Sequence, residues 1–183
     1  MKPLRRPNFA GESGQAVLEV ALSASVIFLL LFGVIDMSRA LYYQQVMKTL
    51  TAEGSSLASR GDGTQLGVVA TTVVNDAGTD MSLTSTGCVI VTAVTNTGAA
   101  KNPDQINQGG QASAGSCSGI VSKVGCAPPS AGCGNASIPS EAAAALQVNQ
   151  SLYITEVYYN YTPVTPFAGS KMLPTRLYDA AYY

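Results

Sequence analysis

The N-terminal third of the chain begins with a long apolar segment. Between residues 16 and 35 the polar side chains are Glu19 and two serines, and the rest are Ala, Val, Leu, Ile, Phe and one Gly. A helix rises about 1.5 Å per residue, so this stretch covers roughly 30 Å, the thickness of the hydrocarbon core of a bilayer. The pattern predicts a transmembrane helix over about residues 16–35.

The helical pattern continues beyond this segment, but with one apolar face. Apolar or small residues recur at alternating steps of three and four, at Ala40, Tyr43, Met47, Leu50, Gly54 and Leu57. We expect one helix over residues 15–59, whose second half packs on its own globular domain, because about two and a half heptads are short for a coiled coil. Asp36 and Arg39, about one turn apart, are expected to pair where the helix leaves the lipid.

A second, shorter helix is predicted after a turn at residues 60–63. Apolar residues follow helical spacing over residues 66–77, with Asp62 or Thr64 as the expected N-cap and Gly78 as the expected end. The segment is rich in β-branched residues, so a buried strand is the alternative interpretation.

Three strands are predicted in the remainder of the chain. Residues 87–98 are rich in Val, Ile and Thr and lie between glycines. Residues 151–162 alternate, which places Leu152, Ile154, Glu156 and Tyr158 on one face and Tyr153, Thr155, Val157, Tyr159 and Tyr161 on the other. A last strand at about residues 173–178 is expected to pair with the second one.

The stretch of residues 99–139 is rich in Gly, Ser, Ala, Asn and Pro, and we expect an irregular loop there. A short helix follows at residues 140–147, with Ser140 as its cap. The predicted fold class is therefore α+β: a long N-terminal transmembrane and amphipathic helix, then a small disulfide-stapled antiparallel sheet domain with a short packing helix.

The four cysteines all lie beyond the apolar segment, at Cys88, Cys117, Cys126 and Cys133. An even number in the predicted exported part indicates disulfides formed in an oxidising compartment, and four cysteines allow three connectivities. The spacings lack the C-x2-C pair typical of structural zinc sites, so we expect disulfides and no metal.

Charge and composition narrow the class of function. The formal net charge is −1, there is no His, and Lys2, Arg5 and Arg6 precede the apolar segment. The sequence offers no basic patch for nucleic acid, no catalytic set that uses His and no sign of a cofactor, so we do not expect an enzyme. Basic residues before the span predict a cytoplasmic N-terminus and an exported C-terminal part. A secretory signal peptide is the rival interpretation, but no small-x-small cleavage site follows the span.

The N-terminal segment "GQAVLEVALSASVIFLLLFGVIDMSRALYYQQVMKTLTAEGSSLASRG" resembles the start of TadE-like proteins, the minor pilins or pseudopilins of tight-adherence (Flp, type IVc) pilus systems. That family has a Gly, a Glu at the fifth position after it, an apolar span, an acidic residue and an Arg-Ala pair. Here these are Gly14, Glu19, residues 22–35, Asp36, Arg39 and Ala40. The segment "VYYNYTPVTPF" (residues 157–167) is similar to the family's aromatic strand and its Pro-containing turn.

The resemblance implies that a prepilin peptidase removes residues 1–14 by cutting between Gly14 and Gln15. Glu19 then becomes the fifth residue of the mature chain, and in a filament its carboxylate pairs with the new α-amino group of a neighbour and sets the register between subunits. The alternative is that Glu19 has no role in assembly and simply extends its carboxylate to the lipid interface. The expected domains are a leader (1–14), a long helix (15–59) and an exported α+β domain (60–183).

Two functions from different classes follow. The first is a pilin-like subunit of the bacterial inner membrane that takes part in assembling a Tad/Flp surface filament used in adhesion or secretion. Its expected partners are other pilin subunits, the prepilin peptidase, the inner-membrane assembly platform and membrane lipid. The second is a single-pass anchored binding module that never polymerises and recognises an external ligand through its stapled loop.

Overall fold

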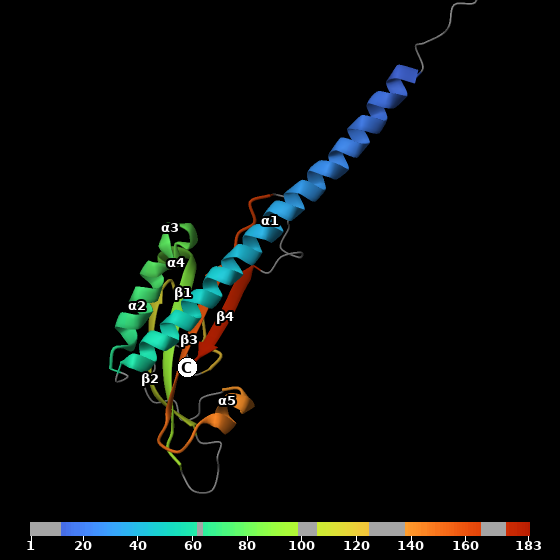
Figure 1. Ribbon diagram of the computed structural model, residues 1–183. Helices are drawn as coiled ribbons and strands as arrows, with labels where there is room; N and C mark the ends of the chain where they lie inside the picture. The colour runs from blue at the N-terminus through green and yellow to red at the C-terminus, as the bar shows by residue number, and fades with distance from the viewer. Residues whose placement is uncertain (1–11, 62–63, 99–105, 125–137, 166–174) are drawn as a thin grey trace, which may run out of the picture. The chain divides into compact units, whose positions relative to one another are not determined.

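The computed structural model describes residues 12–61, 64–98, 106–124, 138–165 and 175–183 (Figure 1). The elements in chain order are α1 (Glu12–Arg60), α2 (Leu66–Asp76), α3 (Gly78–Met81), α4 (Leu83–Thr86), β1 (Gly87–Asn96), β2 (Ile106–Gly115), α5 (Ser140–Ala145), β3 (Ser151–Asn160) and β4 (Arg176–Tyr182). The chain divides into two units. Unit 1 comprises Met1–Arg39 and Pro163–Leu173, and unit 2 comprises Ala40–Thr162 and Pro174–Tyr183.

Helix α1 confirms the predicted long N-terminal helix and begins three residues earlier than expected, at Glu12. In unit 2 its predicted apolar face is buried, with Met47 at 1% exposure, but Leu57 at the end of that face is only half-buried and Ala58 is buried in its place. This shift follows from the helical repeat of about 3.6 residues, which drifts away from a strict 3.5-residue pattern.

The sheet has four antiparallel strands in the order β2-β1-β3-β4. This confirms the predicted fold class, a long apolar helix followed by a small antiparallel sheet with a short helix. Strand β4 pairs with β3 as expected, but it runs to Tyr182, several residues beyond the predicted end. The final residue, Tyr183, exchanges backbone hydrogen bonds with Tyr153, in register with the last β4–β3 pair.

Both faces of the sheet are covered within unit 2. The first eight residues of the central strand β1 are all buried. On one face, Gly54 of α1 lies so close to Thr155 of β3 that a Cβ added at Gly54 would meet the Thr155 methyl group at 2.9 Å, and the Thr51 hydroxyl donates to an Asp179 carboxylate oxygen at 2.6 Å. The two faces that the alternation predicted for β3 are therefore both buried over residues 154–159.

Two small apolar clusters cover the opposite face. One joins Val94 and Ile154 of the sheet to Val124 and to Leu146, which follows α5. The other packs Ile120 against Cys88, Ile90 and Tyr158. Residues 116–124 and α5 therefore form a second layer on the side of the sheet away from α1.

Strand β2 was not expected, because it lies in the stretch predicted to be irregular. Its sequence, INQGGQASAG, has no apolar alternation. It pairs with β1 along the edge of the sheet, where helix α2 packs on its small side chains: a Cβ added at Gly67 would lie 3.9 Å from the Ala112 methyl group. Small residues here allow close helix-sheet approach instead of supplying an apolar face.

Two predicted caps are wrong. The N-cap position of α2 falls on Gln65, which makes no capping hydrogen bond through its side chain, and not on Thr64. The other candidate, Asp62, lies outside the described residues. Helix α5 begins at Ser140, and Pro139 occupies the N-cap position. The first turn of α5 is anchored by the Ala143 N–H, which donates to the Pro139 carbonyl at 2.9 Å.

Candidate functional site

The apolar half of α1 exposes its side chains along its whole length. Val17, Leu22 and Val34 are 70%, 68% and 65% exposed, and the large apolar residues between them are all exposed too, Phe32 least at 37%. Among the described residues, one helix is long and apolar enough to cross a membrane, and it is this one. An apolar surface of this length requires a cover of lipid or protein.

The residues predicted for processing and assembly lie at the start of this helix. Gly14, Gln15 and Glu19 are exposed, and a Cβ added at Gly14 would have nothing within 4 Å. The Gln15 amide donates to a Glu19 carboxylate oxygen at 3.3 Å, so the Glu19 side chain follows the helix toward its N-terminus. The Gly14–Gln15 bond is helical here, and glycine makes a helix easier to open by about 1 kcal/mol relative to alanine.

Asp36, the first residue after the predicted span, is completely buried within unit 1. Its carboxylate accepts hydrogen bonds from the Val164 N–H at 2.9 Å, from the Thr165 N–H at 3.2 Å and from the Thr165 hydroxyl. The sequence predicted a surface pair with Arg39. Arg39 does attract the carboxylate, but the main partners of Asp36 come from a turn 128 residues away along the chain.

These contacts set the charge state of Asp36. The hydrogen bond from the Thr165 hydroxyl lowers the pKa of Asp36 below its ordinary value, burial opposes this, and the two backbone N–H groups and Arg39 lower it further. Asp36 is therefore a carboxylate at neutral pH, and its negative charge is compensated by the turn at Val164 and Thr165.

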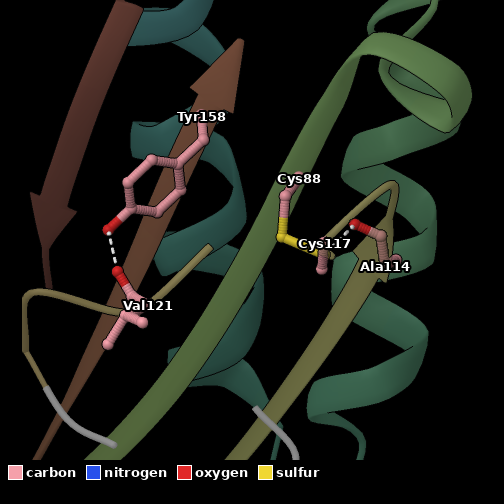
Figure 2. Close-up of a disulfide and its surroundings, with 5 residues drawn as sticks. All are labelled: Cys88, Ala114, Cys117, Val121 and Tyr158. Carbon is pink, nitrogen blue, oxygen red and sulfur yellow. Dashed lines mark hydrogen bonds between the residues drawn. A yellow bond between two sulfur atoms is a disulfide. The ribbon is translucent and has the colours of Figure 1, made fainter. Parts of the chain in front are cut away.

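A disulfide joins Cys88 of β1 to Cys117, which follows β2, with a Cα–Cα distance of 4.8 Å (Figure 2). The Cys117 sulfur lies 3.3 Å from the Ala114 carbonyl oxygen, and because a disulfide sulfur carries no hydrogen this is a contact and not a hydrogen bond. Cys88 is thus paired with Cys117, one of its three possible partners. Cys126 and Cys133 lie outside the described residues.

Glu156 of β3 lies on the same face of the sheet as Cys88, is fully buried and accepts four hydrogen bonds. The donors are the Ser122 hydroxyl, the Lys123 N–H at 2.9 Å, the Tyr158 hydroxyl at 3.0 Å and the Tyr178 hydroxyl at 3.1 Å. Burial first, and the nearby Glu156 charge second, raise the pKa of Tyr158 and of Tyr178, so both remain neutral donors.

The disulfide and Glu156 hold opposite ends of one short segment, residues 117–124. The Tyr158 hydroxyl also donates to the Val121 carbonyl oxygen at 3.1 Å (Figure 2). The Lys123 ammonium lies 3.5 Å above the centre of the Tyr178 ring. The sequence did not identify Glu156 as an anchor. The available signal was a carboxylate on a strand face that otherwise carries Leu152, Ile154 and Tyr158.

These clusters give no sign of metal chemistry. Within the described ranges, no group of three or more Cys, Asp or Glu side chains lies close enough to hold a metal ion. The Glu156 carboxylate is surrounded by four donors of the protein itself, so its chemistry is that of a structural acceptor.

Comparison with known proteins identifies the N-terminal helix. Residues 14–56 match the model of the family described as TadE-like protein. No curated protein and no solved structure gives a significant match. The matched segment begins at Gly14, includes Glu19 and Asp36, and ends in the part of α1 that packs on the sheet. The resemblance seen in the N-terminal segment is therefore confirmed over residues 14–56, which are similar to the TadE-like family.

Proposed function

We propose that this chain is a pilin-like structural subunit that is anchored in the bacterial inner membrane through residues 16–35 and takes part in assembling a Tad/Flp surface filament used in adhesion or secretion. The TadE-like match associates it with pilin-like proteins of that pilus system, a structural and non-enzymatic family. In this proposal the N-terminus is cytoplasmic and unit 2 is exported.

The observation that carries the proposal is the uncovered apolar helix. Removal of each Val, Leu, Ile or Phe side chain on such a surface from water is favourable by about 1.5–3 kcal/mol, so both lipid and helices of the same kind can cover it favourably. A subunit that moves from the membrane into a filament needs a helix surface that can be covered first by lipid and then by other helices. Unit 2, by contrast, has a core of its own and does not need the apolar half of α1 to bury its sheet.

Glu19 gives the proposal its chemistry. Cleavage between Gly14 and Gln15 by a prepilin peptidase creates a positive α-amino group at the end of an apolar helix. A buried amine of this kind needs a partner, and the Glu19 carboxylate of a neighbouring subunit supplies it and fixes the register. In the isolated chain Glu19 contacts Gln15 through a neutral amide, a contact that a charged amine can replace with a stronger one.

The second candidate is an anchored binding module that does not polymerise. The observation that favours it is the segment of residues 117–124, which the disulfide and Glu156 hold firmly while Val121 at its centre remains 61% exposed. A fixed, partly apolar loop of this kind is suited to contact an external partner.

Fractionation of cells that express Glu19→Ala separates the two. The filament proposal predicts that the wild-type chain appears in sheared surface filaments and that the variant stays in the membrane. Glu53→Ala is the matched control, because Glu53 is an exposed glutamate of the same helix within unit 2. Equal recovery of both variants from filaments contradicts the role of Glu19, and absence of the wild-type chain from filaments favours the binding module.

A further inference from the structure

The described part of the turn that binds Asp36 directs its backbone N–H groups at the Asp36 carboxylate. Over residues 163–165 its sequence is Pro-Val-Thr, and proline has no N–H. The two N–H groups that remain, those of Val164 and Thr165, both donate to the Asp36 carboxylate, as does the Thr165 hydroxyl. Within residues 163–165 every backbone donor is therefore paired, which is unusual for an irregular segment at the surface of a protein.

This arrangement matters because of where Asp36 is. An irregular segment is excluded from lipid mainly by its unpaired backbone groups, each of which costs several kcal/mol in hydrocarbon. Here the donors of the turn and the charge of Asp36 satisfy one another at the first position after the predicted span. The same contact thus lowers the cost of bringing these two N–H groups and the Asp36 charge close to a membrane.

The turn also carries an apolar side chain outward. Val164 is 63% exposed, and in the helix the residues on either side of Asp36, Ile35 and Met37, are 47% and 57% exposed. All four residues belong to unit 1, so the exposed apolar side chains of the turn and of the helix lie within one compact unit. The apolar surface of the predicted span is continuous along α1 to the residue that holds the turn.

We propose that the turn at residues 163–165 is a second membrane contact of this chain, in which Val164 inserts at the level of the lipid headgroups beside the end of the transmembrane segment. This rests on the proposed function, because it requires that residues 16–35 lie in a membrane. Asp36 is the positioning residue: it fixes the turn to α1 and leaves Val164 free to meet the lipid. The occupant is lipid, because the Val164 surface continues an apolar helix surface whose first environment is the bilayer.

Fluorescence quenching tests the contact directly, because the chain contains no Trp and each introduced Trp is the only one. The full-length chain is reconstituted into phosphatidylcholine–phosphatidylglycerol vesicles that contain lipids brominated near the headgroup. Val164→Trp reports the turn and Ile35→Trp reports the transmembrane segment. Val148→Trp, at a valine that is 59% exposed in unit 2, gives the background for an exposed position.

The expected result is that Val164→Trp shows about half or more of the quenching of Ile35→Trp, well above Val148→Trp, with a blue-shifted emission. Adding Asp36→Ala to Val164→Trp should reduce the quenching to the Val148→Trp level while Ile35→Trp stays quenched. Thr165→Ala, which keeps both backbone N–H groups, should give an intermediate value and retain the fold if Asp36→Ala does not.

Three results overturn the proposal, and they are distinguishable. Quenching of Ile35→Trp without quenching of Val164→Trp refutes the turn contact but leaves the anchor intact. If Val164→Trp is protected from aqueous acrylamide but is not quenched by the brominated lipid, the surface is covered by a second copy of the chain and not by lipid. No quenching of Ile35→Trp refutes the membrane anchor itself, and with it the proposed function.

Discussion

Substitution of Glu156 tests how residues 117–124 are held on the sheet. In Glu156→Ala the Ser122 hydroxyl, the Lys123 N–H and the Tyr178 hydroxyl lose their acceptor. The Tyr158 hydroxyl is affected less, because the Val121 carbonyl oxygen is a second acceptor 3.1 Å away.

The magnitude follows from these stranded donors. Each buried donor without a partner costs about 1–3 kcal/mol, and Lys123 is exposed enough for water to reach its N–H, so we expect Glu156→Ala to lower the free energy of unfolding by about 3–5 kcal/mol. Glu156→Gln keeps the shape and one acceptor oxygen but brings an amide donor among other donors, and should cost about 1–3 kcal/mol. For a folded unit of this size, these losses lower the melting temperature by roughly 10–15 °C and 3–10 °C.

The assay is thermal unfolding of the full-length chain in detergent micelles, followed by near-ultraviolet circular dichroism of the tyrosines. Glu141→Gln is the matched control, because Glu141 is an exposed glutamate of unit 2 and its substitution should change the melting temperature by less than about 2 °C. The reasoning is refuted if Glu156→Ala is no more destabilising than Glu141→Gln, or if Glu156→Gln is more destabilising than Glu156→Ala.

Three further predictions concern the packing of each unit. Gly54→Ala gains about 1 kcal/mol of helix propensity but forces its Cβ against Thr155, so urea unfolding should show a free energy of unfolding lower by about 1–2 kcal/mol. In the double variant Gly54→Ala with Thr155→Ala, the free energy of unfolding should fall by less than the sum of the two single decreases. The pKa of Asp36 is lowered in the folded chain, so its contribution to stability should be complete above the ordinary value of 3.8 and should fade as the pH drops below it; a ¹³C titration of the Asp36 carboxyl that shows an ordinary or raised pKa contradicts this. Replacing Cys88 and Cys117 with Ser removes a cross-link between residues 29 apart and should lower the free energy of unfolding by about 3–4 kcal/mol, as measured by urea unfolding. An unchanged urea midpoint would show that the disulfide does not stabilise the fold.

The sequence predicted the regular elements whose side chains carry a repeating pattern. Helix α1 follows from an apolar run and then a seam with Met47 in its centre, and β3 follows from strict alternation up to Pro163. Strand β2 could not be predicted, because it is an edge strand that owes its place to pairing with β1 and to small residues such as Ala112 under α2. Its residues show no strand-like alternation in the sequence, and only the pairing with β1 makes the segment a strand.

The site could be predicted only in part, for the same physical reason. Gly14, Glu19 and Asp36 are separated by fixed distances along one helix, so a local pattern identifies them, and the family match covers them. The partners of Asp36 and Glu156 are distant in sequence, and hydrogen bonds to backbone N–H groups such as those of Lys123 and Val164 leave no trace in residue type. Nor could spacing alone select the disulfide from three connectivities.

The central claim is that this chain is processed and assembled as a pilin-like subunit, and the mass of its N-terminal peptide tests that claim most directly. Mass spectrometry of the chain from cells with and without the prepilin peptidase should find Gln15 as the first residue in the first case and residues 1–14 still attached in the second. An N-terminus at Met1 in the membranes of peptidase-containing cells would contradict the account.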